Sequence, residues 1–166
     1  GLEMDFENMS PGQRYDKKDS GWSLAHTQGG HWLAEGPDGL LYDFGPSEPN
    51  SNPQTLKLLR IEDRNGNYLA LRYDEQNRLF QIADSAGRLY ECEYQSPYPE
   101  RVSAVLWKNA PGTAQTLVSY EYDTQGRLSQ VINTLGEISR HFTWHDNGAG
   151  KNLMQSHRLP TGLQSN

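Results

Sequence analysis

The stretch YDTQGRLSQV, residues 122–131, contains the end of one predicted strand, a tight turn and the start of the next strand. Within it, Asp123 stands three residues before Gly126. In a type I turn the first Asp or Asn side chain accepts N–H bonds inside the turn. The fourth residue often needs a positive φ, which Gly adopts freely and Asn tolerates. This stretch therefore predicts a β-hairpin.

The same pattern recurs along the chain. Ile61 recurs as Ile82, 21 positions later, and Tyr73 recurs as Tyr122, 49 positions later, each with its neighbours. Such repetition indicates one small unit used many times. The turn residues that we expect from it are Asp63, Gly66, Asp74, Asn77, Asp84, Gly87, Asp123, Gly126, Asn133 and Gly136.

Side chains between these turns alternate as a half-buried strand requires. Leu69, Leu71 and Tyr73 share one predicted face, opposite Ala70 and Arg72. No segment shows a capped helical stripe. We therefore predict an all-β protein, an antiparallel curved sheet of successive β-hairpins with little or no helix. The aromatic residues expected on its faces are Tyr73, Tyr94, Tyr120, Tyr122, Phe142 and Trp144.

Organisation along the chain follows from composition. We expect an irregular lead-in over residues 1–20, an N-terminal hairpin and loop over 21–54, and the repeat region over 55–166, truncated in mid-repeat. The hairpin pairs residues 31–35 with 40–44 around Gly-Pro-Asp-Gly, and its loop, residues 45–54, is rich in Pro, Ser and Asn.

The composition excludes several classes of protein. With 166 residues, the chain is one domain or a slice of something larger. It contains no run near the ~20 apolar residues of a membrane-spanning helix, and its start lacks the features of a signal peptide. A net charge of −6 without a basic cluster disfavours nucleic-acid binding. The single cysteine, Cys92, forbids an internal disulfide.

Candidate catalytic groups have simpler explanations. Asp74 and Asp123 could act as the paired carboxylates of a hydrolase, but their spacing already makes them turn acceptors. His141 and His145 reach one metal ion only on a helix, and their neighbours alternate as in a strand. Cys92 lies between two tyrosines and is expected to be a buried, inert thiol. We therefore expect no catalytic residue, metal ligand or cofactor, and a protein that is not an enzyme.

Three arginines follow the predicted turns, namely Arg78, Arg88 and Arg127. They can pair with the turn carboxylates or lie over aromatic rings. Solvated surface positions are an equal alternative.

Residues 122–131 resemble the YD repeat, YDxxGRLxxV, of bacterial Rhs (rearrangement hotspot) proteins. The resemblance covers roughly residues 21–166. The chain departs from the pattern where Asn77 replaces Gly, where Glu137 replaces Arg, and where Trp144 stands one position later than the usual tyrosine. The last departure predicts a bulge or an irregular strand near Trp144.

The resemblance implies a segment of a β-cocoon shell that encapsulates a C-terminal toxin, commonly delivered by type VI secretion in interbacterial competition. The implied partners are the remaining shell repeats, the enclosed toxin and, through other domains, the secretion apparatus. The implied location is the bacterial cytoplasm before export and the target cell afterwards. Unpaired strand edges would also favour self-association. The alternative is a carbohydrate-binding or cell-surface β module that presents exposed, coplanar tryptophans.

Overall fold

The structure is a computed structural model that describes residues 9–45, 56–95, 97–110 and 112–165. The chain divides into two compact units, Gly1–Arg88 (unit 1) and Leu89–Asn166 (unit 2). Within the described ranges, no helix has the length and apolar character needed to cross a membrane.

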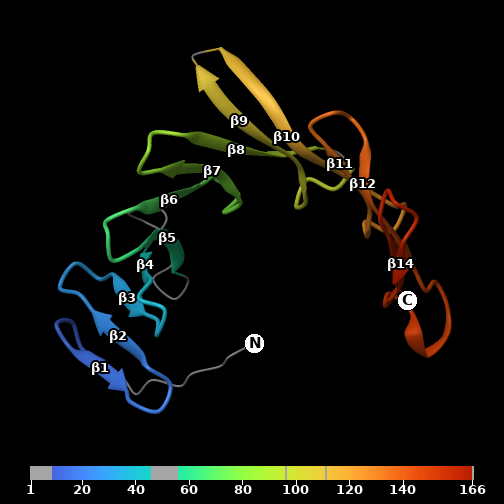
Figure 1. Ribbon diagram of the computed structural model, residues 1–166. Helices are drawn as coiled ribbons and strands as arrows, with labels where there is room; N and C mark the ends of the chain where they lie inside the picture. Colours follow the sequence, from blue (N-terminus) through green and yellow to red (C-terminus); the bar gives the residue numbers. More distant parts are fainter. Residues whose placement is uncertain (1–8, 46–55, 96, 111, 166) are drawn as a thin grey trace. The chain divides into compact units, whose positions relative to one another are not determined.

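Unit 1 forms one antiparallel sheet in which each strand pairs with its neighbours in sequence (Figure 1). Its strands are β1 (Arg14–Lys17), β2 (Trp22–His26), β3 (Trp32–Glu35), β4 (Leu41–Gly45), β5 (Lys57–Glu62), β6 (Tyr68–Tyr73) and β7 (Leu79–Asp84).

Unit 2 repeats this arrangement with longer strands at its start. Its strands are β8 (Leu89–Tyr94), β9 (Val102–Ala110), β10 (Thr113–Tyr122), β11 (Leu128–Asn133), β12 (Ile138–Trp144), β13 (Met154–Arg158) and β14 (Gln164–Ser165). A short 3-10 helix, Gly148–Gly150, lies between β12 and β13.

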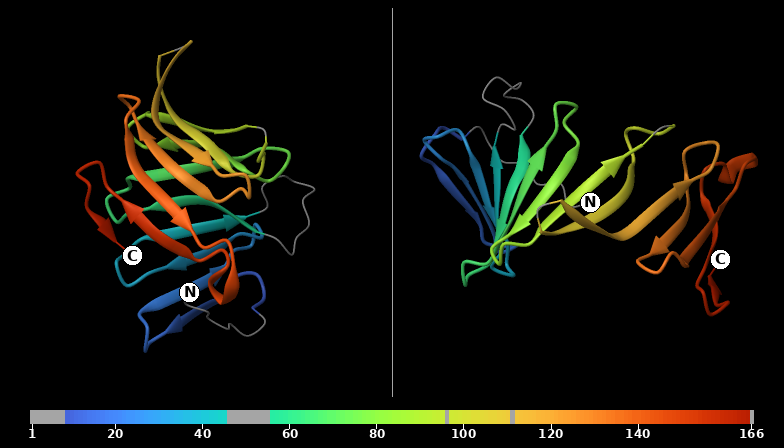
Figure 2. Two further views of the ribbon diagram at one scale, coloured as in Figure 1. Left: turned by 90° about the vertical axis from the view of Figure 1, so that its right-hand side faces the viewer. Right: turned by 90° about the horizontal axis from the view of Figure 1, so that it is seen from above.

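The predicted fold class is confirmed. Within each unit the strands follow one another as antiparallel hairpins, and the helical content of the described residues is that single 3-10 turn. Figure 2 shows that the strands of each unit lie side by side in one twisted layer. Because one layer buries little, Ala104 is the one apolar side chain that is buried among the described residues. Backbone pairing and turns therefore organise each unit more than a core does.

Burial along the strands is more even than the alternation predicts. Every residue of β5 and of β11 is half-buried. Leu69, predicted on one face with Leu71 and Tyr73, is 41% exposed, and Ile138 of β12 is 46% exposed. Alternation still sets which side of the sheet each residue faces, but neither side of a single layer is closed off from solvent.

The expected irregular lead-in is wrong where the structure describes it, because residues 14–17 form β1 and pair with β2. The polar character of β1 explains the difference, since an edge strand without a buried face carries no hydrophobic period. The expected hairpin is present as β3 and β4. Of the loop expected over residues 45–54, residues 46–54 lie outside the described residues.

The bulge predicted near Trp144 is confirmed. The pairing of β12 with β13 changes register between Thr143 and Trp144. Further shifts, which the sequence did not indicate, interrupt the pairing of β10 with both of its neighbours.

Candidate functional site

The repeated turns share one set of hydrogen bonds. In each turn the N–H of the fourth residue donates to the carbonyl of the first, and the N–H of the first donates to the carbonyl of the fifth. The first side chain, through Oδ1, accepts the N–H groups of the third and fifth residues at 2.8–3.0 Å. The turns span residues 63–67, 74–78, 84–88, 123–127 and 133–137.

The fourth residue of each turn has a positive φ. The angle is 62° at Asn77 and 75–82° at the four glycines. Asn77 is thus the one fourth residue among these five turns that carries a side chain, as expected because asparagine tolerates the left-handed region. The glycines are Gly66, Gly87, Gly126 and Gly136.

The side chain of the fifth residue contacts the side chain of the first, either at the second carboxylate oxygen of an aspartate or at the amide of Asn133. Arg78 and Arg127 each bind the carboxylate four residues earlier at 2.7 Å, and Arg88 does the same with Asp84. All three arginines thus pair with their turn carboxylates, while the Arg88 side chain stays 59% exposed and Arg127 also lies over the Trp144 ring. At the departure from the pattern the roles are exchanged, because the Asn133 amide donates to the Glu137 carboxylate at 3.1 Å.

These bonds lower the pKa of the turn aspartates. The side-chain bond from Asn67 is the largest cause at Asp63, and the backbone bond from Arg88 is the largest at Asp84. At Asp74 and Asp123 burial acts to raise the pKa, but the bonds and charges of the paired arginines outweigh it. The folded structure therefore favours the carboxylate form at all four positions.

Arg127 links its turn to the next connection. It binds both Asp123 and Asp146 at 2.7 Å and donates to the carbonyl of His145 at 3.4 Å. Its guanidinium also lies 5.9 Å from the centre of the Trp144 ring. Its side chain is only 14% exposed. The two carboxylates raise its pKa, the bond with Asp146 contributing most.

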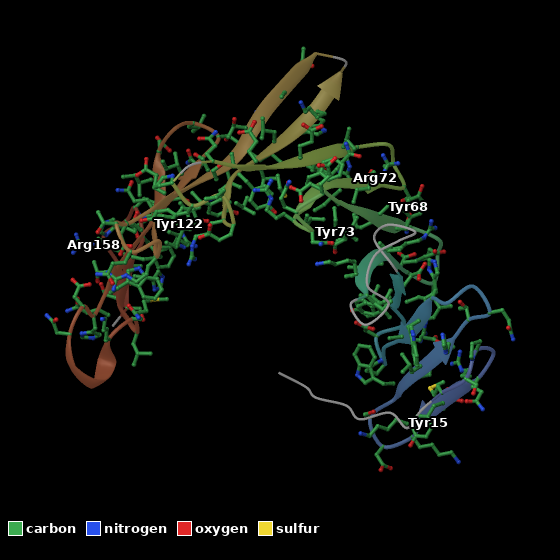
Figure 3. The ribbon with its side chains drawn as sticks, turned by 180° about the vertical axis from the view of Figure 1, so that it is seen from behind. Tyr15, Tyr68, Arg72, Tyr73, Tyr122 and Arg158 are labelled. Carbon is green, nitrogen blue, oxygen red and sulfur yellow. The ribbon has the colours of Figure 1, made fainter. Side chains whose placement is uncertain are left out.

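Three of the expected aromatic residues anchor strand ends through their polar atoms. Two of them, Tyr73 and Tyr122, are labelled in Figure 3. Their hydroxyls donate to the carbonyls of Leu58 and Val102 at 2.9 and 2.7 Å. Trp144 uses its indole N–H in the same way, toward Leu128 at 2.8 Å. Each acceptor lies near the start of the preceding strand. Trp144 thus takes the place of a tyrosine in this contact.

The other aromatic positions differ from one another. Phe142 stacks on His157 with 6.1 Å between ring centres. Tyr94 is half-buried and pairs with Val102. Tyr120 pairs with Val131 and lines a pocket.

Other groups weighed from the sequence have ordinary surroundings. Cys92 is half-buried, and burial raises the pKa of its thiol. In the parts of the chain that the structure describes, no three His, Cys, Asp or Glu side chains gather as a metal site would require. Trp22, Trp32, Trp107 and Trp144 are all half-buried.

Sequence reasoning missed several residues that complete this pattern. Thr27 opens a turn of the same kind, and its hydroxyl accepts the N–H of His31 at 3.0 Å. Residues 159–163 have the same backbone bonds, as do residues 36–40, where the sequence did predict a turn at Gly-Pro-Asp-Gly. The sequence signal for these turns is a Gly three residues after the first position. A search for this Gly that did not also require Asp or Asn at the first position would have found them. Tyr98, whose hydroxyl donates to the Asp123 carbonyl at 2.8 Å, had no such signal.

Comparison with known proteins finds a toxin that is similar to this chain. No family model matches the sequence. Double-stranded DNA deaminase toxin A of Burkholderia cenocepacia (strain H111) is 26% identical over 165 residues, which cover 99% of this chain and 11% of that protein. The chain thus spans a small part of the relative's length. The likeness supports a toxin-related protein.

The comparison also corrects an expectation. The sequence predicted a protein that is not an enzyme. The relative contradicts this prediction, because it is named as a deaminase and deamination is an enzymatic reaction. The expectation rested on the residues of this chain alone, which correspond to 11% of the relative.

Proposed function

We propose that this chain is a wall segment of an enzymatic toxin, and that it surrounds the toxin domain of the same protein until delivery. One observation carries the proposal: the same five-residue turn, with the same hydrogen bonds, recurs through single-layer sheets that bury almost no apolar side chain. Sheets of this kind leave large areas to be covered by another part of the protein. Similarity to a bacterial toxin supports this reading.

The finer proposal is an Rhs-type shell. Its further repeats continue the wall, the toxin is the C-terminal domain, and the protein is made in the bacterial cytoplasm and delivered, by type VI secretion, to a competing cell. The YDxxGRLxxV pattern of residues 122–131 supports it, together with the recurrence of the Asp–Arg turn at 74–78, 84–88 and 123–127.

Breaking the turns in the full-length protein tests the proposal. Asp74→Ala, Asp84→Ala and Asp123→Ala, combined in one variant, remove three side-chain acceptors and three ion pairs. We expect the toxin domain to become accessible to protease, while the activity of the released domain stays unchanged. Asp19→Ala, at an exposed turn position, is the matched control and should protect as well as the wild type.

Two results would count against the proposal. One is a toxin domain that is cleaved equally fast in the wild type and in the triple variant. The other is a loss of enzymatic activity in the triple variant without a change in protection, which would place the chemistry on this chain.

A further inference from the structure

Asparagine is followed directly by glycine at two places in the chain, and the two places differ in their hydrogen bonds. Asn65 lies in the turn between β5 and β6, and Asn147 lies in the connection between β12 and β13. Both asparagines and both glycines are exposed. Such pairs are chemically labile, because glycine has no side chain that hinders the attack of its own backbone nitrogen on the asparagine amide.

At Asn65 the peptide bond to glycine is held by the turn. The N–H of Gly66 donates to the carbonyl of Asp63 at 3.1 Å. The N–H of Asn65 itself donates to Oδ1 of Asp63 at 2.8 Å. Before the nitrogen of Gly66 can turn toward the Asn65 side chain, the turn has to open and lose hydrogen bonds.

At Asn147 the corresponding peptide bond is not held. Among the described residues, none accepts the N–H of Gly148 and none donates to the carbonyl of Asn147. The Asn147 side chain makes no cap bond to the 3-10 helix that begins at Gly148. The backbone is extended at Asn147, with φ −135° and ψ 164°, and φ is +74° at Gly148. This peptide bond can therefore rotate without breaking a hydrogen bond within the protein.

We infer that Asn147 is a site of spontaneous deamidation. The nitrogen of Gly148 gives its proton to a solvent base and attacks Cγ of Asn147. The new C–N bond closes a succinimide ring, and the side-chain nitrogen takes up a proton and leaves as ammonia. Water then adds to one of the two ring carbonyls and breaks its bond to nitrogen. The products are aspartate and isoaspartate, and the reaction consumes only water.

The modification changes the connection that Arg127 binds. Asp146, which precedes Asn147, pairs with Arg127 at 2.7 Å. Either product adds a carboxylate next to Asp146, and isoaspartate also lengthens the main chain by a carbon. The reaction uses the chain's own amide, so the inference is independent of the function proposed above.

Heavy-oxygen labelling of the full-length protein tests the inference. The folded protein is kept in mildly alkaline heavy-oxygen water and digested with an acid protease, and mass spectrometry follows label uptake in the peptides that contain Asn147 and Asn65. We expect Asn147 to react about tenfold faster than Asn65, because Asn65 must first lose one or two hydrogen bonds. In urea the two rates should become similar, which separates the effect of the fold from that of neighbouring residues.

Two variants locate the cause. Asp63→Ala removes the side-chain acceptor of the turn and should speed the reaction of Asn65 toward the rate at Asn147, while Asn147 reacts as before. Asn147→Gln, whose side chain is a methylene longer and cyclises poorly, should abolish label uptake in its peptide.

Three results would overturn the inference. In the first, Asn65 reacts as fast as Asn147 in the folded protein, or faster. In the second, the difference between them is as large in urea as in the folded state. In the third, Asp63→Ala leaves the rate at Asn65 unchanged.

Discussion

The residue four positions after each turn aspartate donates a hydrogen bond to the second oxygen of that carboxylate. Asn67 meets it with an amide, whereas Arg78, Arg88 and Arg127 meet it with a guanidinium. In the turn that ends at Glu137, the first residue is Asn133. There the first residue donates the side-chain hydrogen bond and the fifth residue accepts it. The backbone bonds are the same in all cases, so the side-chain pair adds stability to a turn whose geometry is set by the backbone.

Gly66 provides a test of backbone strain alone. Its φ is +82°, and a Cβ there would meet no atom within 4 Å. Gly66→Ala is therefore expected to destabilise the protein by about 1–2 kcal/mol, the cost of the left-handed region for an L-residue. Urea unfolding measures this. Gly29→Ala, where φ lies outside that region, should cost clearly less. An equal loss in both variants would contradict the argument.

Acid should weaken the fold through the turn aspartates. Their pKa values are lowered in the folded state, so their stabilising contribution is complete above the ordinary aspartate pKa, about 3.9. It is lost as the pH falls below that value, through the lowered folded-state pKa. Urea midpoints measured between about pH 6 and pH 2.5 should fall steeply at the acid end.

The matched variant for this prediction is Asp→Asn at all four positions, because Asn133 shows that an amide preserves the backbone acceptor. This fourfold variant should be less stable at neutral pH, and its urea midpoint should fall less steeply as the pH is lowered. An unchanged acid slope would mean that other groups cause it. The positions are Asp63, Asp74, Asp84 and Asp123.

At the level of elements, hairpins could be predicted because their signal is local. Asp123 and Gly126 lie three residues apart, and the bonds they make close within the same five residues. The register shifts in the pairing of β10 could not be predicted from the sequence, because they depend on which strand lies beside β10. Tyr98 was missed for the same reason, since its contact with Asp123 joins residues 25 positions apart.

The exchanged pair at Asn133 and Glu137 can be tested by a double-mutant cycle. Asn133→Asp alone places two carboxylates together and should destabilise the protein by up to about 1 kcal/mol. Adding Glu137→Arg recreates the Asp–Arg turn and should recover that loss. Thermal unfolding of the four proteins gives the coupling energy. A coupling near zero would show that the pairing contributes nothing to stability.

At the scale of the whole molecule, apolar side chains exposed in the turns favour association. Several large apolar side chains are exposed in unit 2, among them Leu135 at 78% and Leu163 at 69%. We propose that the isolated chain self-associates through such surfaces. Sedimentation velocity should show larger species as concentration rises, and Leu135→Lys with Leu163→Lys should reduce them. A monomer at every concentration would refute this.

The enzymatic character suggested by the relative could not have come from this chain's own pattern. Its recurring residues are used by turns and strand ends, as Asp74 and Tyr73 illustrate. Those roles explain the sequence repeat completely at the local level. The likeness to a toxin came from comparison with a relative and not from the repeat itself.

The most direct measurement is a cryo-electron microscopy reconstruction of the full-length protein. We predict that each of the two units forms a single-layer sheet, and that a separately folded toxin domain packs against it. A reconstruction in which both faces of these strands meet only solvent, or in which their side chains build the substrate pocket of the enzyme, would contradict the account.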